Sequence, residues 1–279
     1  KEEKAESIPE RPENLKEEDN DILPVILIVE DNDDIREYIA TSFSNNYHIM
    51  TATNGKEGIE QALKYIPDII ISDIMMPVMD GIELCKLIKE DVRTSHIPVI
   101  LLTAKDSIQD KEEGYESGAD SYLTKPFSAK LLHSRVHNLL ESRKKLASLI
   151  TNRTKGLKAE QSQEAIKLSR LDEEFLNRFT AIVEENIDMD KLDMSFMMDK
   201  MNMSHSTLYR KIKGLTGISC NEFIRKIRLK NSLRLLMEES LNVSEAAYAS
   251  GFNDLGYFRT CFKEEYGMVP SEYIKQQKL

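Results

Sequence analysis

Five short apolar segments alternate with amphipathic segments between residues 25 and 141. The apolar segments are rich in Val and Ile and predict strands at 25–30, 47–52, 69–72, 98–103 and 121–124. The segments that follow each of them predict helices at 34–44, 56–65, 81–90, 107–117 and 129–141. Strands that alternate with helices of this length form a parallel sheet with helices on both faces. The sequence therefore predicts an α/β domain in this part of the chain.

Polar residues stand at the carboxyl end of four of these strands. The first strand ends at Glu30 and Asp31, the third at Asp73, the fourth at Thr103 and the fifth at Lys125. A flavodoxin-like strand order of 2-1-3-4-5 places the second strand at an edge, away from the ligand crevice. Asp73 alone could be a helix cap or a turn residue. Together the five residues predict one site with three carboxylates, a hydroxyl and an ammonium.

This set of groups fits a phosphoryl acceptor. Clustered carboxylates repel one another and favour a hard cation, and Mg²⁺ suits carboxylates combined with phosphate oxygens. A carboxylate can attack phosphorus to form an aspartyl-phosphate, with Lys125 and Thr103 donating to the phosphoryl oxygens.

A phosphatase of the haloacid-dehalogenase type is the enzyme alternative. An enzyme of that type resembles an Asp-x-Asp pattern, in which the second carboxylate is the general acid. Met75 occupies the position of that second carboxylate, which argues against this alternative.

Residues 25 to about 141 resemble the response-regulator receiver domain. The resemblance rests on the following motifs: Glu30-Asp31, Asp73 with Pro77 and Gly81, Leu101 to Ala104, Gly118 to Asp120, and Lys125-Pro126-Phe127. It implies that Asp73 is the phosphoacceptor and that the protein is no enzyme beyond phosphoryl transfer to itself. It also implies Mg²⁺ ligation by Asp31, Asp73 and the backbone carbonyl of Met75, with Glu30 acting mainly through water. Thr103 and Tyr122 resemble the switch pair, Lys125 contacts the phosphoryl group, and the Lys125-Pro126 bond is expected to be cis.

Charge varies strongly along the chain and suggests its domain boundaries. Residues 1–23 hold four basic and nine acidic residues, and we interpret them as an acidic linker before a receiver domain at 24–141. Residues 142–170 hold eight basic and two acidic residues and are predicted to form a basic, partly helical linker. Residues 171–279 form the second domain, in which 205–234 carry eight basic residues and a single acidic one. A basic stretch of this kind indicates a polyanionic partner.

The second domain shows helical periodicity throughout. Helices are predicted at 196–201 and from about 205 to 213, with Ser204 as the cap of the second helix. A long helix at 222–238 and a second helix pair ending at 255–266 follow. The predicted fold class is thus a flavodoxin-like receiver followed by an all-α domain with two helix–turn–helix units.

These two units resemble the AraC family of transcription activators over residues 172 to about 275. The resemblance rests on Leu208 to Lys211, Leu215 to Gly217, Phe223 to Leu229, Gly251-Phe252, Tyr257-Phe258, Phe262-Lys263 and Gly267 to Tyr273. It implies double-stranded DNA as a partner. The residues expected to bind DNA are Ser206, Tyr209, Arg210 and Lys213 in the first unit and Arg259, Thr260 and Lys263 in the second. Leu255 and Gly256 offer no hydrogen bonds to bases, so the second unit is expected to read sequence more weakly.

The combined pattern predicts a transcription regulator of a two-component system, controlled by phosphorylation of Asp73. A histidine kinase is the expected phosphoryl donor, and phosphorylation is expected to favour a homodimer on DNA. The alternative is a phosphorelay receiver whose helical tail binds protein. No apolar run approaches the length of about 18 residues that spans a bilayer, so this segment is expected to be cytoplasmic without membrane contact. An acidic start without Met resembles the tail of a hybrid sensor kinase, whose parent chain would be anchored in the bacterial inner membrane.

Overall fold

The computed structural model describes residues 23–104, 118–153, 168–188, 192–238 and 241–277. The helix predicted at 107–117 and nearly all of the acidic segment 1–23 lie outside the described residues. Among the described helices, none combines the length and the apolar character needed to cross a membrane.

A five-stranded parallel sheet forms the centre of the first domain. Its strands are β1 (Val25–Val29), β2 (His48–Ala52), β3 (Ile69–Asp73), β4 (Val99–Thr103) and β5 (Ser121–Thr124). The strand order is β2-β1-β3-β4-β5, which confirms the predicted topology. Asp73 pairs with Leu102, and Thr103 pairs with Thr124. This register brings the carboxyl ends of β3, β4 and β5 to one edge of the sheet.

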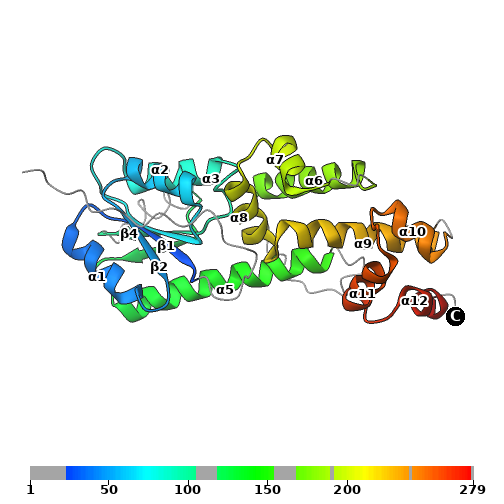
Figure 1. Ribbon diagram of the computed structural model, residues 1–279. Helices are drawn as coiled ribbons and strands as arrows, with labels where there is room; N and C mark the ends of the chain where they lie inside the picture. Colours follow the sequence, from blue (N-terminus) through cyan, green and yellow to red (C-terminus); the bar gives the residue numbers. More distant parts are fainter. Residues whose placement is uncertain (1–22, 105–117, 154–167, 189–191, 239–240, 278–279) are drawn as a thin grey trace, which may run out of the picture.

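Helices cover both faces of this sheet (Figure 1). α1 (Asp33–Phe43) and α5 (Ala129–Arg153) lie on one face, and α2 (Gly55–Tyr65) and α3 (Gly81–Glu90) lie on the other. Side chains alternate along each strand, so Ile26 and Ile28 pack in the layer of α1 and α5. Leu27 and Val29 point to the opposite face and join the layer of α2 and α3. Helices on both faces explain why the three inner strands β1, β3 and β4 are buried along their whole length, whereas the edge strand β2 has exposed residues.

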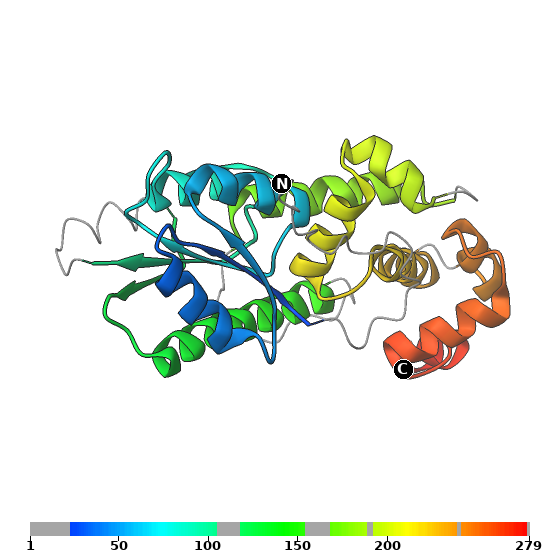
Figure 2. The ribbon, with the colours of Figure 1, turned by 60° about the vertical axis from the view of Figure 1, so that its left-hand side comes forward.

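The second domain is entirely helical within the described residues. Its helices are α6 (Arg170–Glu185), α7 (Met194–Met201), α8 (His205–Thr216), α9 (Cys220–Glu238), α10 (Val243–Ala249), α11 (Leu255–Tyr266) and α12 (Pro270–Gln277). Side-chain caps begin α8 at Ser204 and α11 at Asp254, and left-handed glycines end both helices. The pairs α7–α8 and α10–α11 are the two predicted helix–turn–helix units. α9 extends through both halves of the domain, and Figure 2 shows it nearly end-on between them.

α5 differs from its prediction, since it runs to Arg153, beyond the predicted end at residue 141. The first part of the predicted 142–170 linker is therefore helix, and residues 154–167 lie outside the described part of the chain. Leu146 and Ile150, four residues apart on one side of α5, are buried in the core of the second domain. Thr151 Oγ1 also donates a hydrogen bond of 2.7 Å to the carbonyl oxygen of Thr216 in α8. The chain continues as a helix here because it has a second core to pack against.

Candidate functional site

Three carboxylates meet at the carboxyl ends of β1 and β3. Oxygen atoms of Glu30, Asp31 and Asp73 all lie within 4.8 Å of one another. Glu30 is 1% exposed and Asp73 8%, whereas Asp31 is open to solvent. The cluster is therefore buried on one side and accessible to solvent on the other.

Lys125, directly after β5, supplies the cation of this cluster. Its ammonium lies 2.8 Å from Glu30 Oε2 and 3.1 Å from Asp73 Oδ1. The position of Lys125 is fixed by a 2.7 Å hydrogen bond from its backbone N–H to the carbonyl oxygen of Thr103. The Lys125-Pro126 bond is cis, as predicted. The sequence-predicted carboxylates and ammonium are thus brought together at one point.

The electrostatics of the cluster follow from burial and from the pairing with Lys125. Burial raises the pKa of Glu30, the hydrogen bond from Lys125 opposes this, and the charge of Asp73 raises the pKa further. Burial alone would lower the pKa of Lys125, but hydrogen bonds to Glu30 and Asp73 outweigh it, and the net shift is upward. Lys125 therefore carries its charge at neutral pH.

One ammonium among three carboxylates leaves the cluster with excess negative charge. Carboxylate oxygens at this spacing suit Mg²⁺, so the residues present fit the predicted metal. Met75 lies two residues after Asp73 in the loop to α3, and the residue is 66% exposed. A metal ligand at position 75 would be the backbone carbonyl, because this side chain points into solvent.

Gly81 explains why the β3–α3 loop can pass so close to Asp73. A Cβ atom at position 81 would lie 2.0 Å from the carbonyl oxygen of Asp73. The Gly81 N–H donates to the carbonyl oxygen of Ile74 at 2.9 Å, which closes the loop. Any side chain here would displace the backbone that carries the candidate acceptor.

The two predicted switch residues lie on neighbouring strands. Thr103 is buried at the end of β4, at the same edge as Asp73 and Lys125. Tyr122 is partly buried in β5, opposite Leu101, and packs against the apolar layer of α2 and α3. Tyr122 thus belongs to the other end of β5, three residues before Lys125.

The two helix–turn–helix units present the predicted DNA-binding residues in different ways. In α11, Arg259, Thr260 and Lys263 are all exposed. In α8, Ser206 is exposed, whereas the remaining three predicted residues are partly buried: Tyr209, Arg210 and Lys213. The inward-facing Leu208, Ile212 and Leu215 of α8 are buried, as the periodicity predicted.

Comparisons with known families find a different domain family in each half of the chain. Residues 26–137 match the model of the response regulator receiver domain, and residues 197–276 match a helix-turn-helix domain. The chain joins a response-regulator receiver domain to an AraC-type helix–turn–helix domain. This confirms the family resemblance of both halves.

Individual relatives resemble one or both domains. Histidine kinase P4 of Formosa agariphila is 41% identical over 248 residues, which cover 89% of this chain and 18% of that protein. The DNA-binding dual master transcriptional regulator RpaA of Synechocystis is 40% identical over 119 residues, 42% of this chain and 49% of that protein. The solved receiver domain of Francisella response regulator 1452 is 39% identical, covers 43% of this chain and 98% of its own, and has a TM-score of 0.40. This chain thus spans half or less of each of the two curated relatives.

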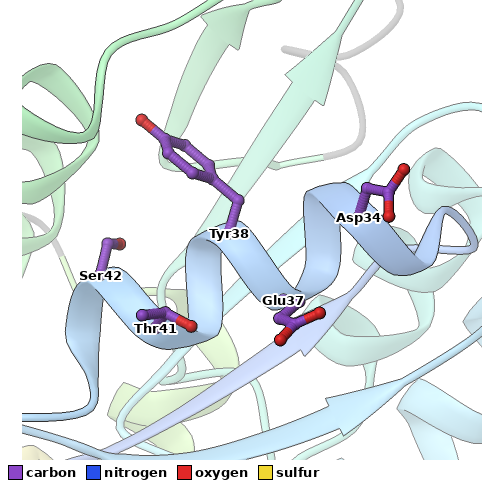
Figure 3. Close-up of a pocket in the computed structure, with 5 residues that line it drawn as sticks. All are labelled: Asp34, Glu37, Tyr38, Thr41 and Ser42. Carbon is purple, nitrogen blue, oxygen red and sulfur yellow. The ribbon is translucent and has the colours of Figure 1, made fainter.

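A hollow of about 390 Å³ lies on the outside of α1, apart from the acidic cluster of the receiver domain. Figure 3 shows that its lining residues all come from this helix: Asp34, Glu37, Tyr38, Thr41 and Ser42. The Tyr38 hydroxyl accepts a hydrogen bond of 3.2 Å from the N–H of Ala129, at the start of α5. Tyr38 therefore joins α1 to α5, and we assign this open hollow no chemistry.

A second hollow of about 780 Å³ separates the two helix–turn–helix units. It is lined from both sides, by Tyr209, Arg225 and Arg228 and by Asn253 and Tyr257. This space lies between the two candidate reading helices α8 and α11.

Several basic residues of the 205–234 stretch have acidic partners. Lys211 pairs with Asp172 at 2.7 Å, Lys226 pairs with Glu265, and Arg225 lies 3.9 Å from Glu222. The positive surface charge of the basic stretch 205–234 is therefore smaller than the count of its basic residues indicates.

Sequence reasoning missed three residues that the structure places at key positions. Arg36 of α1 donates a 2.7 Å hydrogen bond to the carbonyl oxygen of Glu30 and so holds the end of β1. Asp172 and Lys211 form a buried ion pair. The available signal was a charged residue in an apolar helical pattern, which by itself usually marks a solvated face.

Proposed function

We propose that this chain is a phosphorylation-controlled, DNA-binding transcription regulator of a two-component system. The observation that carries the proposal is the Lys125 ammonium set between Glu30 and Asp73, in a chain that also contains two helix–turn–helix units. The first feature suits a carboxylate that accepts a phosphoryl group, and the second suits recognition of DNA.

Asp73 is the proposed acceptor. One of its carboxylate oxygens forms a bond to phosphorus, while the bond from phosphorus to an imidazole nitrogen of the donor breaks. The electron pair of that bond stays on the imidazole nitrogen. Lys125 and Thr103 donate hydrogen bonds to the phosphoryl oxygens. Lys125 thereby gives up part of its contact with the Asp73 carboxylate and pairs with the negative charge of the phosphoryl group.

Glu30, Asp31 and Asp73, with the backbone carbonyl of Met75, are the proposed holders of Mg²⁺. Bound there, the ion neutralises negative charge on the phosphoryl oxygens and on the acidic cluster. The donor is a phosphohistidine of a histidine kinase. The histidine kinase that resembles 89% of this chain supports a hybrid parent, in which kinase and receiver belong to one protein.

The acceptor assignment is tested by labelling the chain with radioactive acetyl phosphate and Mg²⁺. We expect label on the wild type and none on Asp73→Asn. Asp80→Asn is the matched control, because Asp80 caps α3 in the same loop and Asn caps a helix equally well. Loss of label in both variants, or in neither, would refute the assignment to Asp73.

The proposed DNA contacts come from α8 and α11, whose amino-terminal halves face the major groove in helix–turn–helix proteins. Ser206, Tyr209 and Arg210 contact bases from α8, and Arg259 and Thr260 do so from α11, with Lys213 and Lys263 directed at phosphates. Gly256 has no side chain, so the second unit reads sequence more weakly than the first.

DNA binding is tested by selecting duplexes from a random pool and titrating salt against the tightest one. We expect log K to fall with log salt by about 0.9 for each phosphate neutralised, and we expect Lys263→Ala to reduce that slope by about one phosphate. Lys275→Ala, an exposed lysine in α12, is the control. A flat salt dependence would favour the alternative, a phosphorelay receiver with a protein-binding tail.

Phosphorylation is proposed to act by changing the association of receiver domains. A homodimer doubles the DNA contacts and raises the apparent affinity without any new contact at the bases.

A further inference from the structure

The receiver turn, residues 91–98 between α3 and β4, contacts the helical domain through buried polar groups. The hydroxyl of Ser95 donates to Asp172 Oδ1 of α6 at 2.7 Å and accepts from the Lys211 ammonium of α8 at 3.1 Å. Ser95 is 2% exposed, and Asp172 and Lys211 are completely buried. The two domains are therefore in direct contact here, and the contact is closed to solvent.

His96, the next residue of the turn, places its imidazole ring in the same interface. The residue is buried, and its ring packs against Gly214 of α8. A Cβ atom at position 214 would lie 2.7 Å from His96 Cδ2 and 2.9 Å from Nε2. Glycine is unfavourable inside a helix, so the room that it leaves for the ring gives Gly214 a physical reason.

The His96 ring carries a polar atom without a partner. Nδ1 is buried and has no hydrogen-bond partner within the part of the chain that the structure describes. In a neutral imidazole one nitrogen carries no proton, whereas in the protonated ring both nitrogens are donors that require acceptors. A buried donor without an acceptor is costly. The interface therefore suits the neutral ring and not the charged one.

The charged groups that face the ring come from four helices. Three of them are cations, namely Lys89 of α3, Arg143 of α5 and Lys211 of α8, and Asp172 of α6 is an anion. Asp172 already pairs with Lys211 at 2.7 Å. Burial lowers the pKa of His96 well below its usual value, and the charge of Lys211 lowers it further against the opposing effect of Asp172.

Two further carboxylates belong to this region, and cations hold both of them. Asp91 of the receiver turn pairs with Arg93 at 2.6 Å. Asp120 lies 2.6 Å from the Lys89 ammonium and 3.3 Å from the Arg143 guanidinium. A positive charge on the His96 ring would therefore find no unpaired carboxylate among these groups.

We propose that the contact between the receiver turn and the helical domain is sensitive to pH, and that protonation of His96 separates the two surfaces. In the closed state the ring is neutral and packs against Gly214. In the separated state water surrounds the ring and stabilises its positive charge. The inference goes beyond the proposed function, because it requires neither phosphorylation nor DNA.

The direction of the effect follows from the two states of the ring. In the separated state the pKa of His96 returns to about 6.5, whereas the closed state holds it far lower. The closed state is therefore fully stable above about pH 6.5 and loses stability as the pH falls below this value. From about pH 7.5 to about pH 5.5 the equilibrium should shift about tenfold toward the separated state.

The experiment uses the full unphosphorylated chain without DNA. Hydrogen exchange in peptides covering 91–98 and 205–216, corrected for the intrinsic pH dependence of amide exchange, reports the contact. Proton NMR of the histidine rings reports protonation. For the wild type we expect the protection of both peptides to fall about tenfold from about pH 7.5 to about pH 5.5. We also expect the His96 ring to titrate far below the exposed His137.

His96→Gln is the test variant, because glutamine is polar and of similar length but gains no proton in this pH range. It should keep the same protection at both pH values. His137→Gln is the matched control, because His137 is exposed on α5. This control should lose protection about tenfold, as the wild type does.

Each remaining result would overturn the proposal. An equal loss of protection in the wild type and in His96→Gln would mean that another group titrates. Constant protection in the wild type would mean that the contact does not respond to pH. If His96→Gln is unprotected even at about pH 7.5, the wild-type ring decides, and a His96 ring that titrates together with His137 would overturn the proposal. None of these results bears on phosphorylation or DNA binding, so the proposed function stands or falls separately.

Discussion

At the scale of single residues, the ion pair between Asp172 and Lys211 shows how burial and charge oppose each other. Burial lowers the pKa of Lys211, although the charge and hydrogen bond of Asp172 act in the opposite direction. Burial alone would raise the pKa of Asp172, but Lys211 and hydrogen bonds from Lys211, Ser95 and Ser169 outweigh it, and the net shift is downward. The ionised form of Asp172 is therefore favoured by Lys211, and each charge of the pair depends on its partner.

Asp172→Asn should destabilise the chain because it leaves the Lys211 charge buried without a counter-ion. We expect the free energy of unfolding in urea to fall by about 3–5 kcal/mol, the usual cost of breaking a buried pair from one side. Asp193→Asn is the control, since Asp193 caps α7 at the surface and Asn is an equivalent cap. Equal effects of the two substitutions would contradict the role given to the pair.

The same pair predicts a pH dependence. The pKa of Asp172 is lowered in the folded state, so its stabilising contribution is complete above the unfolded pKa of about 3.9. This contribution is lost as the pH falls through the lower folded value. The stability difference between wild type and Asp172→Asn should therefore be constant from neutral pH to about pH 4 and should shrink only in stronger acid. A difference that shrinks near pH 6 would show that another group is responsible.

At the scale of elements, the sequence predicted the sheet and its order because alternating patterns and turn residues are local signals. It also predicted which residues meet at the carboxyl edge, since strand order determines which strand ends are neighbours. It did not predict the end of α5, because Leu146 and Ile150 are too few to show that a second core exists. Nor could it identify Lys211 as buried, because the partner Asp172 lies 39 residues away and the covering Ser95 belongs to the other domain.

The continuous helix α5 connects the two domains, and breaking it should affect only its second half. Lys144→Pro should break this helix between the two cores, because proline removes one helical hydrogen bond and costs about 3 kcal/mol in a helix interior. Lys144 is exposed and pairs only weakly with Glu141 across one turn, so Lys144→Ala is a control that keeps the helix. We expect the proline variant to lose hydrogen-exchange protection in 144–153, with little change in β1 and β3. Full protection of 144–153 in the proline variant would contradict the view of α5 as one continuous helix.

At the scale of the whole molecule, the acidic cluster and the receiver turn that contacts the helical domain lie at opposite ends of the receiver sheet. The acidic cluster lies at the carboxyl ends of the strands, whereas Ser95 and His96 precede the amino end of β4. Figure 1 shows α5 passing under the sheet and continuing beneath α8. We therefore propose β4 and α5 as the route by which a change in charge at Asp73 would reach the helical domain.

The most direct test of this account is DNA affinity measured before and after phosphorylation of the same preparation. Acetyl phosphate and Mg²⁺ are added to the wild type and to Asp73→Asn, and binding to the tightest selected duplex is followed by fluorescence anisotropy at constant salt. The account predicts higher affinity for the phosphorylated wild type and no change for Asp73→Asn. An equal affinity of the wild type with and without phosphorylation, or the same increase in Asp73→Asn, would contradict it.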